Sequence, residues 1–125
     1  MGFWVFMLFV DLLIPFTMIG LGRYFFKKPP RHINPVFGYR TAMSMKNEDT
    51  WRFAHHYFGK LWFQVGLILL PVTVIAALFT IGKTEMDIGT TGGIISGIQI
   101  LLILGSMFPV ERALRKTFDK NGNRR

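Results

Sequence analysis

Three long apolar runs constrain this chain more than any other feature of its sequence. They cover about residues 3–22, 61–82 and 92–110, and each is close to the roughly 20 apolar residues that a helix needs to cross a bilayer. Charged residues make up 18% of the chain and cluster between the runs, whereas a soluble domain would interleave them with apolar positions. The sequence therefore predicts an all-α membrane protein, with three transmembrane helices in one domain of 125 residues.

The first apolar run is expected to remain as a helix rather than to be cleaved as a signal peptide. No Lys or Arg precedes Arg23, whereas a signal peptide has a basic start. The run ends in the bulky sequence Tyr24-Phe25-Phe26, where a cleavage site would need small residues. Pro15 and Pro71 lie inside the first and second runs and predict bends, which membrane helices tolerate.

Basic residues set the expected orientation of these helices. Of the 15 Lys and Arg residues, all but Lys83 lie either between Arg23 and Lys60 or in the tail, residues 111–125, which is expected to fray at Asn121-Gly122-Asn123. Basic residues favour the cytoplasmic side of a membrane, so the N-terminus is expected outside the cell and the C-terminus in the cytoplasm. Because the basic clusters flank apolar runs, the net charge of +8 predicts contact with anionic headgroups of the cell membrane and not with nucleic acid.

The longest polar segment of the chain, residues 34–60, lies between the first two runs. Asn34-Pro35 and Gly38 predict a turn at its start. Asn47, with Ser44 as the alternative, predicts the N-cap of a helix that then continues to the end of the segment. The segment is expected to lie at the cytoplasmic surface of the membrane.

The expected helix after this cap has two different faces. A polar stripe recurs at every fourth position: Glu48, Arg52, His56 and Lys60. Another face is mostly aromatic and carries Trp51, Ala54, Phe58, Leu61 and Trp62. This pattern is typical of an amphipathic helix that lies in the bilayer interface, with Trp51 and Trp62 as its anchors in the headgroup layer.

One series of residues in this segment is spaced in register with a known family. The series is Gly38-Tyr39-Arg40-Thr41, Ser44-Met45-Lys46-Asn47, Thr50-Trp51, Ala54 and Gly59-Lys60. It resembles the signature of the SdpI family of small bacterial membrane proteins, and the resemblance extends over about residues 34–109. The residues that it implies for binding a partner or ligand are Gly38, Tyr39, Arg40, Thr41, Ser44, Asn47, Thr50, Trp51 and Lys60.

The resemblance implies a function without catalysis. The namesake of the family confers immunity to a secreted killing peptide, and it also acts in signalling by holding a repressor at the membrane. By this likeness, the chain is expected to confer resistance to a membrane-active peptide toxin and to bind the toxin or a cytoplasmic regulator. We also expect a homodimer, because a single layer of three helices buries little surface.

Polar residues inside the apolar runs suggest an alternative function. Asp11, Thr73 and Gln99 each lie about 10–14 Å from the outer end of their run at 1.5 Å per residue, which places them near the middle of the membrane. We expect them to form one polar layer in which the Gln99 amide donates to Asp11. A charged Asp costs about 2.5–3.5 kcal/mol at the centre of a helix, so Asp11 is expected to be protonated. Asp11 either packs the helices together or carries protons in a small transporter or channel.

The sequence carries no motif of an enzyme. It has no cysteine, no nucleotide-binding loop and no HExxH, so no catalytic residue, metal or cofactor is predicted. His55 and His56 are adjacent and point about 100° apart on a helix, which favours structural or interfacial roles over metal binding. Arg40 has two open interpretations: it ties its turn to the start of the helix, or it binds an anionic ligand or partner.

Overall fold

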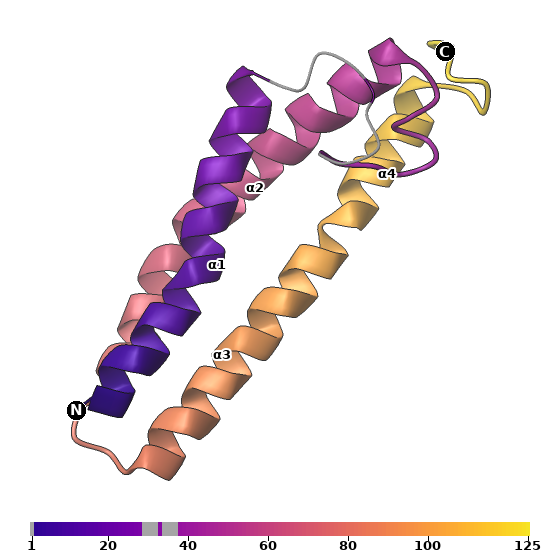
Figure 1. The fold of residues 1–125 in the computed structure, drawn as a ribbon. Coiled ribbons are helices and arrows are strands. Elements are labelled where there is room, and N and C mark those ends of the chain that lie inside the picture. The colour runs from indigo at the N-terminus through magenta and orange to yellow at the C-terminus, as the bar shows by residue number, and fades with distance from the viewer. Residues whose placement is uncertain (1, 29–32, 34–37) are drawn as a thin grey trace.

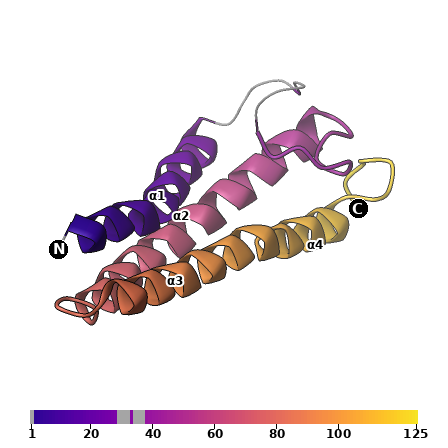
Figure 2. The same ribbon diagram turned by 60° about the horizontal axis from the view of Figure 1, so that its bottom comes forward.

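The computed structural model describes residues 2–28, 33 and 38–125 of the chain. The described residues form four α-helices: α1 (Gly2–Lys27), α2 (Glu48–Leu78), α3 (Glu85–Gly105) and α4 (Met107–Thr117). Figures 1 and 2 show α1 lying along α2, α3 running back beside them, and α4 continuing the direction of α3. The two termini therefore lie at opposite ends of the bundle (Figure 1).

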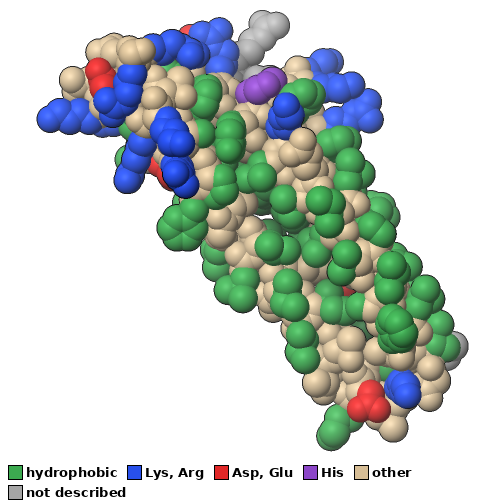
Figure 3. Space-filling view, turned by 180° about the vertical axis from the view of Figure 1, so that it is seen from behind, with side chains coloured by type: hydrophobic (Ala, Val, Ile, Leu, Met, Phe, Trp, Pro, Cys, Tyr) green, Lys and Arg blue, Asp and Glu red, His purple; other side chains and the backbone are tan. Residues whose placement is uncertain are grey.

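The described residues contain three helical segments long and apolar enough to cross a membrane. They are Gly2–Lys27, Glu48–Leu78 and Glu85–Thr117, the last of which joins α3 to α4. Large apolar side chains face outward along them, with Phe9 65% and Ile68 68% exposed, as expected for helices that lipid surrounds. Figure 3 shows these side chains along the middle of the molecule, with Lys and Arg gathered at one end. The predicted all-α class with three spans is confirmed.

Glycines let α1 and α2 approach until their backbones touch. A Cβ atom at Gly22 would lie 2.5 Å from the Phe63 backbone nitrogen, and one at Gly59 would lie 2.6 Å from the Gly22 carbonyl oxygen. Gly66 makes a third close approach, against Ile19. Small residues at such crossings give membrane helices the van der Waals contact that holds them together.

The interfacial helix predicted within residues 34–60 is not a separate element. α2 begins at Glu48 and continues through the second apolar run, because no proline lies between the two parts and the single Gly59 is tolerated in a helix. At 1.5 Å per residue its 31 residues span about 46 Å, more than the roughly 30 Å of a hydrocarbon core, so its first turns extend beyond the membrane. The face expected to lie in lipid is buried against the protein instead, at Trp51, Ala54 and Phe58.

The third predicted span, residues 92–110, differs from the helices at both ends. α3 begins earlier, at Glu85, because the side chain of Thr84 caps its first turn. At the other end, Pro109 has no N–H to donate to the carbonyl of Gly105, and the helix is interrupted there between α3 and α4.

The other predicted boundaries differ less. The first predicted span, residues 3–22, lies inside α1, and the second, residues 61–82, runs past the end of α2 because residues 79–82 form turns. Pro15 and Pro71 lie inside α1 and α2 without ending either helix. The turn predicted at Asn34-Pro35 lies outside the described residues.

Residues 38–60 and 107–125 pack with the end of α1 into a compact unit, which we call the head. Its core consists of buried residues from all of these segments: Phe25, Tyr39, Ala54, Phe58, Val110, Leu114 and Phe118. The head lies at the end of the molecule where Lys and Arg gather in Figure 3, which we call the basic end. It brings together three parts of the chain that are far apart in sequence.

Candidate functional site

The signature series begins with a turn that is fixed onto α2 by one histidine. Gly38 has a φ of 117°, a conformation that other residues rarely adopt, and a Cβ atom there would clash with the Nε2 atom of His55. The backbone N–H of Tyr39 donates to the same Nε2 atom at 2.8 Å. Glycine is therefore required at position 38 both for the backbone angle and for the approach to His55.

This bond fixes the protonation of the His55 ring. Because Nε2 accepts a hydrogen bond from Tyr39, the ring proton is assigned to Nδ1, which donates to the Trp51 carbonyl oxygen at 2.8 Å. The ring lies against that of Trp51, with 4.2 Å between centroids. His55 is fully buried in the head, before the apolar part of α2, and burial lowers its pKa below the ordinary value. The structure thus assigns a neutral His55 to the centre of the head.

Two reciprocal pairs of hydrogen bonds shape the rest of the signature. In the first pair, the Thr41 N–H donates to Ser44 Oγ at 2.9 Å and the Ser44 N–H donates to Thr41 Oγ1 at 3.2 Å. In the second, the Asn47 N–H donates to Thr50 Oγ1 at 3.0 Å and the Thr50 N–H donates to Asn47 Oδ1 at 2.9 Å. The second pair is a capping box at the start of α2, so the predicted N-cap Asn47 is confirmed.

Most signature residues are therefore structural: they pack inside the head and are not exposed for binding. Ser44, Thr50 and Trp51 are buried, and Trp51 has no exposed surface at all. The predicted role of Trp51 as an anchor in the headgroup layer is wrong, because the turn at Gly38 lies against its ring. Among the residues predicted to bind a partner, Arg40 and Lys60 are exposed.

The C-terminal tail is part of the same structure. The Asn47 side-chain amide donates to the Gly122 carbonyl at 2.7 Å, and the Arg124 guanidinium donates to both carboxylate oxygens of Asp49 at 2.8 and 2.9 Å. This pair lowers the pKa of the Asp49 carboxyl. The expectation that the tail frays at Asn121-Gly122-Asn123 is wrong, because Gly122, with a φ of 86°, lets the chain turn back onto the start of α2.

Tyr39 joins the signature to α4. Its hydroxyl donates to Glu111 Oε1 at 2.8 Å, and its ring lies 4.8 Å from that of Phe58, centroid to centroid. Burial and the neighbouring carboxylate raise the pKa of Tyr39 above its ordinary value. Glu111 could not be predicted as its partner from the sequence, because the two residues are 72 positions apart.

Inside the membrane-spanning part, the three predicted polar residues meet in one layer. The Gln99 amide donates to the Asp11 backbone carbonyl at 2.8 Å and to Thr73 Oγ1 at 3.2 Å. The predicted layer is confirmed, but the amide does not reach the Asp11 carboxyl. The carboxyl instead accepts from Ser96 Oγ at 2.7 Å. Ser96 was missed, although it lies three residues before Gln99 and thus on the same helix face.

The layer has two further features. A small cavity of about 10 Å³ borders Asp11, and its lining includes Trp4, Thr80, Thr91 and Gly92. This volume is near the lower limit for one water molecule. The side-chain oxygen of Gln99 is buried and has no hydrogen-bond partner among the described residues.

Two tryptophans donate hydrogen bonds to neighbouring helices or turns. The Trp62 indole N–H donates to Ser106 Oγ at 3.0 Å, which joins α2 to the break between α3 and α4. The Trp4 N–H donates to the Ala77 carbonyl and to Thr80 Oγ1 at the opposite end of the bundle. The predicted interfacial anchor Trp62 thus has a partner within the protein.

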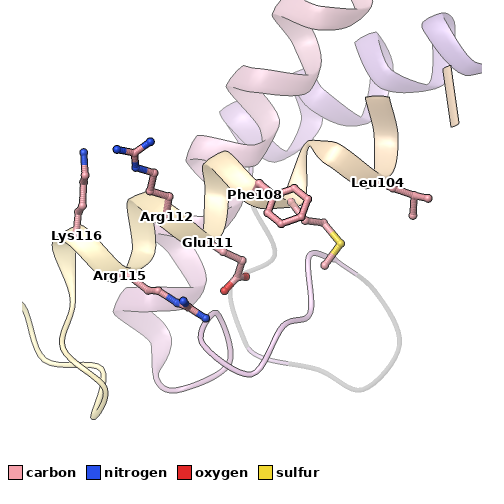
Figure 4. A pocket seen from close by; sticks show the side chains of 7 residues that line it. Leu104, Phe108, Glu111, Arg112, Arg115 and Lys116 are labelled. Atoms are coloured by element: carbon pink, nitrogen blue, oxygen red, sulfur yellow. The ribbon is translucent and has the colours of Figure 1, made fainter. Parts of the chain in front are cut away.

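A surface pocket of about 610 Å³ lies where α3 meets α4 (Figure 4). Its lining consists of Leu104, Met107, Phe108, Glu111, Arg112, Arg115 and Lys116. Figure 4 shows that the side chains of Arg112 and Lys116 point to one side of α4 and that of Arg115 to the other. The pocket is therefore apolar toward α3 and charged toward the head. We call it the junction pocket.

Within residues 2–28, 33 and 38–125, no group of three or more His, Asp or Glu side chains is placed to hold a metal ion. His55 uses both ring nitrogens for hydrogen bonds inside the head, and His56 lies on the surface against Phe26.

Comparison with known proteins matches residues 31–110 of the chain to the SdpI/YfhL protein family. Among curated proteins, the chain is similar to the "Uncharacterized protein YfhL" of Bacillus subtilis (strain 168), with 42% identity over 41 residues. The aligned part is 33% of this chain and 37% of that relative, so the match spans little more than a third of the relative's length. No solved structure matches the chain. The family resemblance drawn from the signature residues is confirmed.

Proposed function

Because the chain belongs to the SdpI/YfhL family, we propose that it confers immunity to a membrane-active peptide toxin, as a multi-pass protein of a bacterial cell membrane. The observation that carries the proposal is the family match over residues 31–110, which includes the signature and all of α2 and α3. The proposal extends to this chain the role of the family's namesake. It requires binding and no catalysis.

The structure suggests how such a protein would bind a peptide in the membrane. The buried signature residues hold the head in one conformation, so the exposed Arg40 is presented at a fixed place at the basic end. The junction pocket has an apolar wall at Leu104 and Phe108 and cations at Arg112 and Lys116. An amphipathic peptide that inserts its apolar face beside α3 would contact both the apolar wall and the cations of the junction pocket.

Protection can be measured directly in cells. A bacterium killed by a secreted peptide of the kind that the namesake neutralises should survive at least about tenfold more peptide when it carries this chain, a difference of about 1.4 kcal/mol in effective binding. Arg40→Ala should abolish protection while the protein still accumulates in the membrane. Arg52→Ala, which removes another exposed cation of the head, is the matched control and should protect as wild type. If Arg40→Ala protects fully, the assignment of Arg40 is wrong.

We also propose that the basic end faces the cytoplasm, where the head would hold a soluble regulator, and that the protein acts as a homodimer. The orientation follows from the charge distribution. With no native cysteine, a cysteine at Thr84 should react with an impermeant reagent in intact cells, whereas one at Lys120 should not. Reaction at position 120 from outside would invert this topology.

The polar layer supports a second candidate, a small proton-coupled transporter or channel. Asp11 is 3% exposed, its carboxyl accepts a hydrogen bond from Ser96, and a small cavity borders it. In this case purified protein in liposomes should conduct protons, and Asp11→Asn should stop the flux without unfolding the protein. Equal flux for both proteins, or none for either, would leave Asp11 with a packing role.

A further inference from the structure

A second surface pocket lies between α1 and α2 at the basic end. Its volume is about 420 Å³, and its lining comes from both helices: Arg23, Phe26, Lys27, Lys60, Phe63, Gln64 and Leu67. We call it the α1–α2 pocket. It shares Lys60 with the signature series, and it shares no lining residue with the junction pocket.

The glycine contact between the helices explains why cations from both helices meet there. Gly22 and Gly59 bring the two backbones into contact, and each is followed directly by a basic residue of the pocket, Arg23 and Lys60. Lys27 lies one turn after Arg23 and thus on the same face of α1. Side chains of this length on helices in backbone contact converge on one place.

The charge of the α1–α2 pocket is of one sign. Arg23, Lys27 and Lys60 are exposed, and none of the described residues that line the pocket is acidic. The junction pocket differs, because Glu111 lies among its cations. Three cations and the side-chain amide of Gln64 form a set of donors that suits the oxygens of a phosphate group.

The apolar part of the pocket indicates which kind of phosphate-containing molecule fits it. Phe63 and Leu67 lie one turn apart on α2, inside the apolar run that crosses the membrane. They line the pocket below the cations, where an acyl chain would lie. Phe26 forms part of the rim, and its ring rests on that of His56 with 4.8 Å between centroids. A soluble phosphate would leave this apolar part empty.

We propose that the α1–α2 pocket binds one anionic glycerophospholipid, with its phosphate between Arg23, Lys27 and Lys60 and an acyl chain along Phe63 and Leu67. This site is more specific than the general attraction of basic residues to a membrane surface. It does not depend on the proposed immunity function. The bound lipid would fill the space between α1 and α2 just below the head.

Native mass spectrometry of the purified full chain in detergent, with phosphatidylglycerol added, tests the proposal. One lipid per chain should be retained, and phosphatidylcholine with the same acyl chains should be retained at least about tenfold less, since each basic residue near an anionic lipid contributes about 1 kcal/mol. The variant R23Q/K27Q/K60Q should lose binding by a similar factor. The control R112Q/K116Q/K120Q removes the same number of Arg and Lys at the same end and should bind as wild type.

Two further measurements distinguish a specific lipid site from a site for a soluble phosphate and from a general effect of the substitutions. R23K/K27R/K60R keeps the charges and should retain the lipid, so that a loss seen only in the glutamine variant follows from the missing charges. Glycerol phosphate in excess should not displace the lipid, because it lacks the acyl chain. Equal losses in the two glutamine variants, equal retention of phosphatidylcholine, or displacement by glycerol phosphate would each overturn the proposal.

Discussion

The head and the polar layer each contain a network of side-chain hydrogen bonds, but the two networks stabilise different things. In the head, they satisfy an irregular backbone: the N–H groups of Tyr39, Thr41 and Asn47 all donate to side chains. In the layer, the helices already satisfy their own backbones, and Ser96 and Gln99 set how α3 lies against α1 and α2. The head should therefore lose far more stability than the layer when a single side chain is removed.

The largest effect is expected in the aromatic centre of the head. Trp51→Ala should lower the free energy of unfolding by about 3–5 kcal/mol, because it removes a fully buried aromatic side chain and leaves a cavity. The measurement is unfolding by denaturing detergent in mixed micelles, followed by circular dichroism. Tyr57→Ala, at an exposed position of the same helix, is the control. Equal losses for both variants would contradict a structural role for Trp51.

The next effect is a pH dependence that comes from His55. Its pKa is lowered in the folded protein, so the unfolded chain binds more protons once the pH falls below about 6.5, and stability should fall there by no more than about 1.4 kcal/mol per pH unit. Above this pH the stabilisation is fully present. Protonation also removes the acceptor for the Tyr39 N–H.

Melting temperatures at pH 7.5 and 5.5 would check this dependence. His55→Gln should reduce the difference between the two temperatures, because glutamine has no titrating group. His56→Gln, which changes an exposed neighbour, should keep the difference. If both variants keep it, another group causes the pH dependence.

A smaller effect is expected in the polar layer. Ser96→Ala should cost about 0.6 kcal/mol, the average for a hydrogen bond between membrane helices. Ser44→Ala should cost more, because it removes the acceptor for the Thr41 N–H in a buried turn. The same unfolding titration compares the two variants. A larger loss for Ser96→Ala would reverse the contrast between head and layer.

The smallest effect is expected for the tail. The Arg124–Asp49 pair is exposed and screened by salt, so Arg124→Gln should change the melting temperature little, and less still at high salt. The pKa of Asp49 is lowered, so the contribution of the pair is present above the ordinary Asp pKa of about 3.9 and is lost as the pH falls further. Thermal melts at pH 7 and pH 3 would show it. A loss as large as that of Ser44→Ala would mean that the tail is essential to the head.

Predictions from the sequence were accurate for features that depend on the residues of a single segment. The three spans follow from the length of their apolar runs, the N-cap at Asn47 from its side chain, and the shared level of Asp11, Thr73 and Gln99 in the bundle from counting residues along each run. The predictions failed where distant segments meet. The aromatic face that includes Trp51 has the same pattern whether lipid or protein covers it, and periodicity cannot distinguish the two.

The sequence by itself determined that this chain is an all-helical membrane protein of the SdpI/YfhL family, because span length, charge placement and signature spacing are local properties. Only the tertiary structure decided that the signature is mostly a buried framework, with His55 accepting from Tyr39 and the tail closing over Asn47. The same holds for the Asp11 carboxyl, whose partner is Ser96 and not Gln99. These pairings join residues up to 85 positions apart, and which donor meets which acceptor depends on how the helices pack against one another.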